Sequence, residues 1–354
     1  MSLLPTHLAN RGRPLTHDML TSYRGAWHLP WIIERYLVAT QGAFTLHKVL
    51  NAAIALLEMQ MGVVETRSLP IVLRLEPCNI CNLKCPLCAC GNGADTRKKG
   101  VISIDDFVFA LEQCKENAMI LRLDGLGEPT LHPRIFELVR IAKSLNYSVV
   151  MHSNLNTRAC AEPEQFVDCG LDRLVISIDG ATPETHAKYR VGGDLDAVVS
   201  RTRRLVQYRK LTRVTHPIVE VQTVDFDFNR PQREQLHRLC QELEVDRYEI
   251  TEAESFAKRE PSRLPHQCFW LWTVATVTWD LEYRSCANAW SLQWPLINMR
   301  DTPIRDWWNC QCIREARRFN LGKQGLSIGT DCNCKCGRCY EMAVVPLQGR
   351  YTCE

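Results

Sequence analysis

Short apolar runs alternate with amphipathic stretches between residues 70 and 255, and this alternation determines the predicted fold. Between the runs, apolar residues recur at three- and four-residue spacing, which is typical of helices packed on a sheet. Strands that alternate with helices predict a parallel sheet built from βαβ units. Six units are too few to close an eight-fold barrel, so we expect an α/β fold with an open, partial (β/α)6 TIM-like barrel. The predicted strands cover 71–77, 119–125, 147–153, 173–180, 217–226 and 247–253.

The pattern changes on both sides of the barrel region, so we expect three units. Residues 1–69 show helical spacing, as in "PWIIERYLVAT" and "FTLHKVLNAAIALLEMQM". Residues 70–255 form the barrel. Residues 256–354 begin with a predicted β-hairpin, "CFWLWTVATVTWDLEYRSC", and end in the cysteine-dense "TDCNCKCGRCY". This last unit has too little apolar sequence for a large core of its own, so we expect metal to hold it together.

Charge and hydropathy narrow the class of protein. The net charge is +3, and the densest basic run, 201–210, is interleaved with apolar residues as on one side of an amphipathic helix. This argues against a nucleic-acid partner, which needs a concentrated basic face. The chain start lacks a secretory pattern, and no apolar run reaches the ~20 residues that span a bilayer. We therefore expect a cytoplasmic protein without a membrane partner.

The chain has 18 cysteines, and in a reducing compartment clustered cysteines more often bind metal than form disulfides. Five lie between Cys78 and Cys90, and nine lie from Cys268 onward. The remaining four are scattered, and we expect them to be small buried side chains. These are Cys114, Cys160, Cys169 and Cys240.

Cys81, Cys85 and Cys88 follow the spacing C-x-x-x-C-x-x-C directly after the first predicted strand. Three thiolates on one loop can hold three irons of a cubane iron–sulfur cluster, whereas four would fill every iron site. One iron then stays open for a substrate or cofactor, as in an open catalytic metal site. A zinc-binding loop is the alternative. Cys78 and Cys90 flank the motif, and we expect them to be bystanders.

This loop resembles the signature of the radical S-adenosylmethionine (radical SAM) enzymes. In that family the open iron chelates the amino and carboxylate groups of SAM. The reduced cluster then breaks a C–S bond to give a 5′-deoxyadenosyl radical, which abstracts hydrogen from the substrate. The resemblance implies a [4Fe–4S] cluster, SAM and a reducing partner such as a flavodoxin or ferredoxin. One position departs from the common pattern, because Leu87 stands where many members have an aromatic residue.

The ends of the next two predicted strands resemble the family's SAM-contacting segments. The second strand ends in "LDGLGEPTLHP", where Gly127 and Glu128 correspond to the segment that holds the SAM amino group. Glycine allows the backbone to approach a ligand closely. The third strand ends in Ser153 and Asn154, where the family holds the SAM ribose.

The fourth strand carries the stretch "VISIDGATPETHAKYRVGG". In this stretch Ser177 resembles a ribose contact. Arg190 resembles the arginine that pairs with the SAM carboxylate, a role that suits a guanidinium. The resemblance also implies that the fifth strand, near Val221 and Gln222, lies by the adenine.

The tail resembles the auxiliary-cluster extensions called SPASM and, in a shorter form, Twitch. Cys268 and Cys286 flank the predicted hairpin, and Cys336 and Cys339 form a C-x-x-C pair; the resemblance implies that these four ligate one auxiliary [4Fe–4S] cluster. A second cluster would use Cys332, Cys334 and Cys353. Leu281 replaces the glycine usual before the second hairpin cysteine. Cys310 and Cys312 are either ligands or bystanders, and a structural zinc module is the alternative for the tail.

Relatives with this extension include peptide maturases, sulfatase-maturing enzymes, and dehydrogenases or epimerases of sugars and aminocyclitols. The pattern of residues 1–69 looks helical and gives no strand signal for the three-stranded sheet of a leader-binding domain. We therefore expect an oxidoreductase or epimerase acting on a small molecule such as a sugar, an aminocyclitol or another natural-product intermediate. A peptide-modifying maturase is the alternative, and an iron–sulfur carrier or zinc-binding scaffold is the non-enzyme alternative. We identify no catalytic acid or base. Four charged residues near the strands face the cavity, face solvent or are paired structurally: Arg122, Glu220, Glu252 and Glu254.

Overall fold

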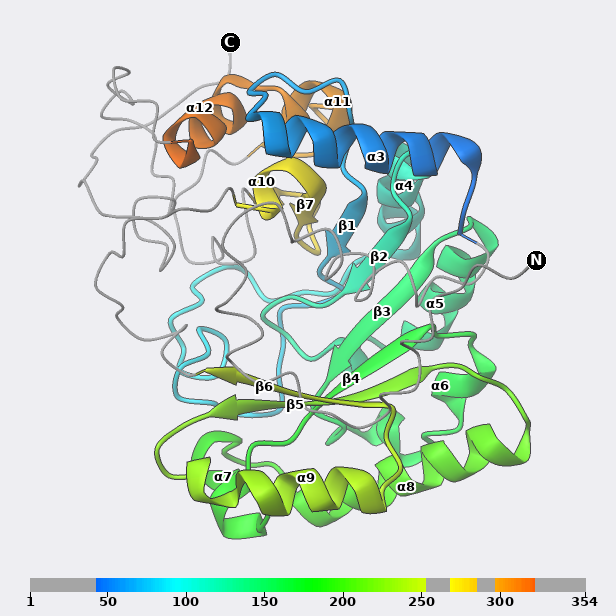
Figure 1. The fold of residues 1–354 in the computed structure, drawn as a ribbon, viewed down its shortest axis with the longest axis vertical. Helices are drawn as coiled ribbons and strands as arrows, with labels where there is room; N and C mark the ends of the chain where they lie inside the picture. The colour runs from blue at the N-terminus through cyan, green and yellow to red at the C-terminus, as the bar shows by residue number, and fades with distance from the viewer. Residues whose placement is uncertain (1–42, 253–267, 285–296, 322–354) are drawn as a thin grey trace.

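An eight-stranded sheet forms the centre of the protein in a computed structural model that describes residues 43–252, 268–284 and 297–321 (Figure 1). The strand order is β6-β5-β4-β3-β2-β1-β7-β8, and only β8 runs antiparallel to its neighbour. All six strands predicted for the barrel are present, so the α/β partial-barrel class is confirmed. The strands are β1 (Val72–Leu75), β2 (Ile120–Leu123), β3 (Ser148–Ser153), β4 (Arg173–Ser177), β5 (Ile218–Asp225), β6 (Arg247–Glu252), β7 (Val274–Val277) and β8 (Tyr283–Arg284).

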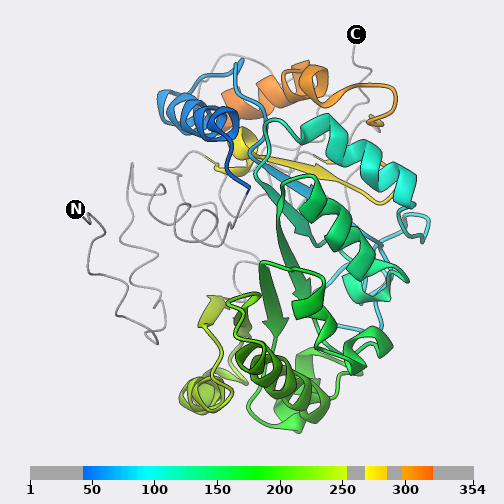
Figure 2. The same ribbon diagram turned by 90° about the vertical axis from the view of Figure 1, so that its right-hand side faces the viewer.

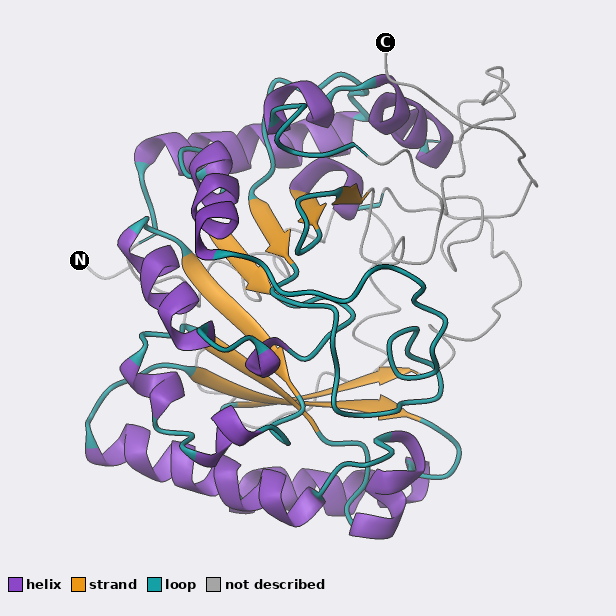
Figure 3. Ribbon diagram, turned by 180° about the vertical axis from the view of Figure 1, so that it is seen from behind, coloured by secondary structure: helices purple, strands orange, loops and turns teal. Residues whose placement is uncertain are grey.

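Helices follow the strands along the chain and cover the outer side of the sheet (Figures 2 and 3). The helices on this side of the barrel are α4 (Ile104–Cys114), α5 (Ile135–Ser144), α6 (Gln165–Asp168), α7 (Pro183–Tyr189), α8 (Leu195–Leu211) and α9 (Arg233–Glu242). The others are α3 (Leu46–Met61), α10 (Trp270–Thr273), α11 (Ile304–Trp308) and α12 (Gln311–Asn320), with single 3-10 turns at η3 (Pro129–Leu131), η4 (Arg158–Ala161) and η5 (Arg230–Gln232). No helix in the described ranges is long and apolar enough to span a bilayer.

The start of α4 shows how local sequence sets these helices. Ser103 accepts a hydrogen bond from the Asp106 backbone N–H at 3.0 Å and donates its hydroxyl to the Asp106 carboxylate at 2.7 Å. This is an N-terminal cap, in which side chains satisfy amide groups that the helix leaves open. Phe107 and Leu111 of α4 are fully buried against Leu121 and neighbouring strand residues. Burial of such apolar surface supplies most of the stabilisation of the helix layer.

The opposite face of the sheet packs against α3 and α10. Ala55 and Met59 of α3 join Val72 and Ile120, which lie at the starts of β1 and β2, in a second apolar cluster. Asn51 fixes α3 to the chain entering β1, because its side-chain amide donates to the Leu69 carbonyl and accepts from the Leu69 amide, both at 2.9 Å. Helix α3 therefore covers the amino ends of the first two strands and leaves their carboxyl ends open.

The hairpin predicted for the tail is β7–β8, and it extends the barrel sheet, because β7 pairs in parallel with β1. The beginning of the predicted hairpin is wrong: Trp270–Thr273 form the helical turn α10. The Trp272 indole N–H donates to the Val63 carbonyl at 2.8 Å, and the Thr273 hydroxyl donates to the Phe269 carbonyl at 2.7 Å. These tertiary and local bonds outweigh the strand preference of aromatic and β-branched residues. At Leu281 the backbone adopts the left-handed conformation that favours glycine, with φ of 66°.

Candidate cofactor site at the carboxyl ends of the strands

The loop after β1 carries Cys81, Cys85 and Cys88 and folds back on itself. Cys85 is buried, and the other two cysteines are half-buried. The Cys88 amide donates to the Cys85 carbonyl at 3.1 Å. Gly91 closes the loop, since a Cβ there would come within 2.5 Å of the Cys85 backbone nitrogen. Lys84 donates its amide to the Val191 carbonyl at 2.9 Å, which ties the loop to the segment after α7.

N–H groups lie near two of the three sulfur atoms, those of Cys81 and Cys85. Cys81 Sγ accepts from the Leu83 amide at 3.4 Å and lies 3.9 Å from Asn154 Nδ2, while Cys85 Sγ lies 4.0 Å from Arg190 Nη1. Such donors stabilise the charge of metal-bound thiolates. Burial raises the pKa of Cys81 to about 12, so without metal this thiol keeps its proton at neutral pH. Metal binding then has to release the proton, because the thiolate is the ligand. Within the described ranges, no three His, Cys, Asp or Glu side chains lie close enough together to hold a single metal ion. A cubane cluster does not require this, because each thiolate binds a different iron at a separate corner. The loop fits such a cluster.

The glycines after β2 allow the second strand to end directly against the cysteine loop. A Cβ on Gly127 would lie 2.3 Å from the Cys78 carbonyl oxygen, and one on Gly125 would lie 2.4 Å from the Glu76 side chain. The next amide, that of Glu128, donates to the Ile80 carbonyl at 2.8 Å. We predicted close approach to a ligand at Gly127, and the contact present in the structure is with the protein's own backbone.

The carboxylate of Glu128 is buried and accepts hydrogen bonds from four groups. Thr130 donates its hydroxyl at 2.6 Å and its amide at 3.2 Å, the Ser153 hydroxyl donates at 2.7 Å, and the Asn154 amide donates at 2.8 Å. Burial raises the pKa of Glu128, and these bonds oppose the increase. The side chain thereby joins the carboxyl ends of β2 and β3. Its expected contact with the SAM amino group stays a prediction.

Asn154 and Ser177 lie at the ends of neighbouring strands. Asn154 Nδ2 donates to Asn82 Oδ1 at 3.0 Å, so this side chain links the end of β3 to the cysteine loop. Ser177 is half-buried at the last position of β4, where it pairs in register with Gln222 of β5. The strand order therefore brings Ser153, Asn154, Ser177 and Gln222 to one edge of the sheet, as the family pattern implies.

Arg190 is held over the cysteine loop by Asp179, a residue that the sequence analysis did not single out. Arg190 Nε donates to the Asp179 carboxylate, whose other oxygen accepts from the Val224 amide at 2.5 Å. Asp179 is fully buried, and its carbonyl accepts from Asn229 Nδ2 at 3.0 Å. An arginine anchored through Nε keeps further N–H groups for a carboxylate ligand. The signal for Asp179 was its place in "SIDG", directly after β4.

An aromatic group beside the cysteine loop was also missed. Tyr189, Phe226 and Phe228 contact one another, with ring centroids 4.6 Å apart for the first pair and 5.1 Å for the second. They pack together with Cys85 and Leu83. Leu87 is exposed, so these rings rather than Leu87 supply the apolar surface next to the cysteines. The repeated phenylalanines of "DFDFN", after the fifth strand, were the signal available in the sequence.

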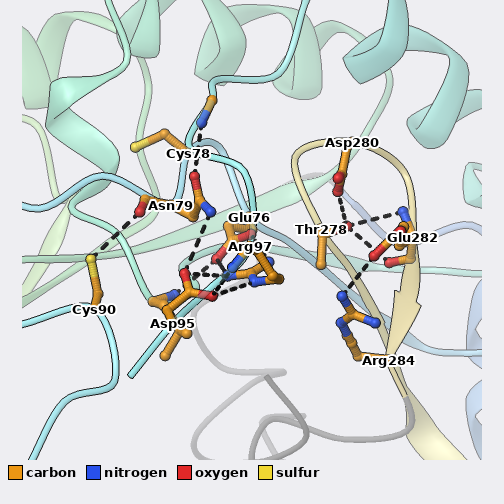
Figure 4. Close-up of polar contacts among 12 residues, drawn as sticks. Glu76, Cys78, Asn79, Cys90, Asp95, Arg97, Thr278, Asp280, Glu282 and Arg284 are labelled. Atoms are coloured by element: carbon orange, nitrogen blue, oxygen red, sulfur yellow. Dashed lines mark hydrogen bonds and ion pairs between the residues drawn. The ribbon is translucent and has the colours of Figure 1, made fainter. Parts of the chain in front are cut away.

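A buried ion pair connects the two sides of the cysteine loop (Figure 4). Arg97 donates to both oxygens of Glu76, at 2.8 and 3.1 Å, and the Leu126 amide donates to Glu76 Oε1 at 3.0 Å. Arg97 also pairs with Asp95, which accepts from Lys99 at 3.0 Å. The network joins the end of β1, the segment after the cysteines and the glycine segment of β2. Its charged residues flank the cysteine motif, but nothing in their spacing predicts this pairing.

Two of the four charged candidates named from the sequence, Arg122 and Glu220, have structural partners, whereas nothing is described for the Glu252 side chain. Arg122 donates from Nε to Asp124 Oδ1 at 3.0 Å, and Glu220 forms a buried ion pair with Arg173. Of the alternatives stated for Arg122 and Glu220, structural pairing is therefore the one that the structure shows. Glu254 lies outside the described residues.

Most of the second cysteine group lies outside the described residues: Cys286, Cys332, Cys334, Cys336, Cys339 and Cys353. Cys268 is half-buried before α10, where its amide donates to Asn320 Oδ1 at 2.7 Å. Cys312 of α12 is buried in the main core, and Cys310, just before α12, packs against the same core. Cys78 is buried, with Sγ 3.2 Å from the Glu128 carbonyl, and Cys90 Sγ lies 3.5 Å from the Asn79 carbonyl (Figure 4). The auxiliary ligand set stays a prediction.

Comparison with known families gives a match over the barrel. Residues 75–227 match the Radical SAM superfamily. The match begins at the end of β1 and ends just after β5, so it includes the cysteine loop, the glycine segment, Asp179 and Arg190. Of the aromatic group it covers Tyr189 and Phe226 but not Phe228.

Curated relatives share part of the chain. A tungsten-containing aldehyde ferredoxin oxidoreductase cofactor-modifying protein of Pyrococcus furiosus is 27% identical over 177 residues, which cover 49% of each chain. A PqqA peptide cyclase of Bradyrhizobium diazoefficiens is 26% identical over 206 residues, which cover 57% of this chain and 51% of the relative. The chain thus spans about half the length of the curated relatives it matches.

Among solved structures, Streptococcus suis SuiB bound to the precursor peptide SuiA is similar with a TM-score of 0.60 and 14% sequence identity. The similarity covers 84% of this chain and 79% of SuiB. At this level of identity the comparison establishes a shared fold and no more.

Proposed function

We propose that this chain is a radical SAM enzyme that modifies a peptide substrate, because residues 75–227 match the Radical SAM superfamily. The cofactors of that family are a [4Fe–4S] cluster and SAM. When bound, the reduced cluster and SAM supply a 5′-deoxyadenosyl radical that abstracts hydrogen from the substrate. The observation that carries the proposal is the position of Arg190, held by Asp179, beside the three cysteines of a loop inside the matched domain.

The choice of a peptide rests on the names of the relatives. One curated relative is a PqqA peptide cyclase, and SuiB was solved with a precursor peptide. These favour the peptide alternative over the small-molecule substrate that we expected from the helical pattern of residues 1–69. That expectation carries less weight, since some maturases recruit a separate leader-binding chain. Oxidation and epimerisation are not supported by the relatives, so we propose only hydrogen abstraction followed by peptide modification.

Each part of the site has a proposed role in this reaction. Cys81, Cys85 and Cys88 hold the cluster, and Arg190 binds the SAM carboxylate in the orientation set by Asp179. Glu128 keeps the ends of β2 and β3 together rather than reacting, since four groups already donate to its carboxylate. Gly127 allows the loops after β1 and β2 to meet.

The tail supports a second role, which we also propose. Cys268, Cys286, Cys336 and Cys339 hold an auxiliary [4Fe–4S] cluster, and a flavodoxin or ferredoxin reduces the protein. The β7–β8 hairpin pairs with β1, the strand that leads into the cysteine loop. An auxiliary cluster on this hairpin would therefore be attached to the same sheet as the SAM site.

The experiment starts with anaerobic reconstitution with iron and sulfide. Dithionite and SAM are added, and 5′-deoxyadenosine is quantified by mass spectrometry. We expect it from the wild type and from Cys90→Ala, and none from Cys85→Ala. Peptides encoded beside the gene are then added one by one, and a mass change in one of them supports the peptide proposal. Cleavage of SAM with no change in any peptide, but with turnover of a sugar or aminocyclitol, would refute it.

A further inference from the structure

Helix α3 has its charged residues on the inside and its apolar residues on the outside. Lys48 and Glu58 are the only charged residues of this helix, and both are buried. Lys48 Nζ donates to the Asn146 carbonyl at 2.8 Å. The Glu58 carboxylate accepts from the Arg67 amide at 2.7 Å and from the Ser68 amide at 3.1 Å. A surface helix normally turns its charges toward solvent, so the outer face of α3 suits contact with an apolar surface better than contact with water.

Seven large apolar side chains are exposed on α3 and directly before it. They make up more than half of the exposed large apolar residues in the described part of the chain. Leu46 and Met61, at the two ends of the helix, are each 76% exposed. The seven are Phe44, Leu46, Val49, Leu50, Ile54, Leu57 and Met61. Ala53 is also exposed, at the centre of the same face.

The exposed apolar area of this face is large enough for a specific interface. The exposed fractions of the seven residues are together equivalent to about four whole residues. At about 200 Å² for a residue of this size, the face offers roughly 800 Å². This equals the area of about 800 Å² that each partner contributes to a protein interface of standard size, and it exceeds the largest apolar patch of a typical monomer, about 300–600 Å².

The order of residues on this face makes it complementary to itself. Leu46, Leu50, Ala53 and Leu57 follow the four-three-four spacing of the seam between two closely packed helices. If a second α3 lies antiparallel on the first, about the midpoint between Ala53 and Ile54, every seam position meets an apolar residue. The facing pairs are Leu46–Met61, Leu50–Leu57 and Ala53–Ile54. A two-fold interface requires such an exchange, in which residue i contacts residue j and j contacts i.

The position of α3 leaves the cofactor site accessible. Thr45 accepts from the Lys48 amide at 3.2 Å at the start of the helix, and Gly62, with φ of 63°, donates its amide to the Met59 carbonyl at 3.1 Å at the end. Between these caps α3 lies along the outside of the sheet, over the amino ends of β1 and β2 (Figures 1 and 2). A second copy bound there does not cover the carboxyl ends of the strands, where the cysteine loop lies.

We propose that the outer face of α3 is the interface of a homodimer, in which two copies of this chain pack their α3 helices antiparallel about a two-fold axis. A second copy is favoured over an unrelated partner because the face matches itself. The helix also exposes no Asp, Glu, Lys or Arg that would select a partner by charge. The small Ala53 at the centre allows the two helices to approach closely. The dimer does not depend on the reaction proposed above, because the cysteine loop lies at the opposite ends of the strands.

Sedimentation velocity of the reconstituted full-length protein, under anaerobic conditions and from low micromolar concentration to about 100 µM, tests the dimer. We expect a monomer–dimer equilibrium in the wild type. Leu50→Glu places a carboxylate against Leu57 of the partner subunit and should raise the dissociation constant of the dimer at least tenfold. Leu211→Glu is the matched control and should keep the wild-type constant, because Leu211 is 81% exposed at the end of α8, outside this face.

The double variant Leu50→Glu/Leu57→Lys tests the antiparallel arrangement. Within one helix, two turns separate positions 50 and 57, so these side chains face each other only between copies. Each glutamate then meets a lysine of the second copy, and the double variant should dimerise at least threefold more tightly than Leu50→Glu alone. A double variant that dimerises no more tightly than Leu50→Glu would refute the antiparallel arrangement.

Two results would overturn the interface itself: a wild type that stays monomeric over the whole concentration range, or a dimer that Leu50→Glu leaves unchanged. A monomer that binds phosphatidylcholine vesicles, and loses this binding in Leu50→Glu, would assign the face to a lipid surface. A monomer in which Met61 stays protected in radical footprinting would assign it to another part of the chain. Cluster absorbance equal to that of the wild type shows that Leu50→Glu is folded. If it does not fold, Leu46→Glu, at an end of the face, carries the same test.

Discussion

Gly127 lies so close to Cys78 that a Cβ on the glycine would stand 2.3 Å from the cysteine's carbonyl oxygen. The same Cβ would lie 2.7 Å from the Ile80 carbonyl oxygen. Both obstacles are backbone atoms, which cannot rotate away as the end of a side chain can. The loops after β1 and β2 therefore meet at this position, and the cysteine loop depends on a residue that is not part of it.

Gly127→Ala should consequently displace the start of the cysteine loop and lower its capacity to hold a cluster. We expect iron and sulfide content per chain after reconstitution to fall by at least half, with a lower melting temperature. Gly93→Asn is the matched control, because Gly93 has a φ of 79°, which asparagine tolerates, and nothing lies within 4 Å of its Cβ position. Full loading of Gly127→Ala would show that the loop moves without consequence.

The barrel strands and the α4 cap are predictable from sequence because each depends on a local pattern. The pairing of β7 with β1 is not predictable in this way. It places Val72 beside Val274, which the whole barrel sequence separates, and hydrophobic alternation does not specify the register between strands so far apart in sequence. The helical turn at Trp270–Thr273 was missed for a related reason. A bond from Trp272 to the distant Val63 carbonyl helps to decide its conformation.

The site divides in the same way. Cysteine spacing and the order of the strand-end segments locate the cofactor loop, Asn154 and Arg190, because family motifs are stretches of consecutive residues. The partners of these residues come from other elements, so the pairing of Asp179 with Arg190 and that of Glu76 with Arg97 depend on the fold. Residues that hold a site together are thus harder to predict than residues that bind its ligand.

Asp179→Asn should weaken SAM binding while leaving the cluster in place. An asparagine can still accept from the Val224 amide but loses the charge that orients Arg190. We expect the dissociation constant of SAM to rise about tenfold, or ~1.4 kcal/mol, in anaerobic equilibrium binding with the reconstituted protein. The cluster absorbance of the variant is the internal control. Unchanged SAM affinity would show that Arg190 keeps its position without Asp179.

His186 should make the stability of the barrel depend on pH. This side chain is fully buried, accepts from the Asp179 amide through Nδ1 at 3.2 Å, and has its pKa lowered by burial from 6.5 to about 4. Between these values the unfolded chain binds a proton that the folded chain does not. The stability contribution is therefore complete above pH 6.5 and is lost as the pH falls toward 4, by about 3 kcal/mol in all.

The measurement compares urea unfolding of the wild type and of His186→Leu from pH 5 to 7. We expect a steeper loss of stability on acidification in the wild type, although the variant is less stable at pH 7 because it lacks the Nδ1 hydrogen bond. Parallel curves for the two proteins would mean that His186 titrates at its ordinary pKa in the folded state.

The Glu76–Arg97 pair should support both the stability of the fold and the binding of the cluster. Glu76 is fully buried, and the Arg97 side chain is 14% exposed, so Arg97→Gln leaves a carboxylate inside the protein without its charge partner. Breaking a buried pair on one side costs roughly 3–5 kcal/mol. The Leu126 amide alone compensates little of this loss. We expect a reduced free energy of unfolding and reduced iron loading, because the pair joins both sides of the cysteine loop.

The control is Arg134→Gln, which removes an exposed pair with Glu137 and should cost less than about 1 kcal/mol. The double variant Glu76→Gln/Arg97→Gln separates charge from packing, since it removes both ions and leaves similar volumes. If the unpaired charge causes the loss, the double variant is more stable than Arg97→Gln alone. If the double variant is instead the less stable of the two, the geometry of the pair, rather than its charge balance, holds the loop in place.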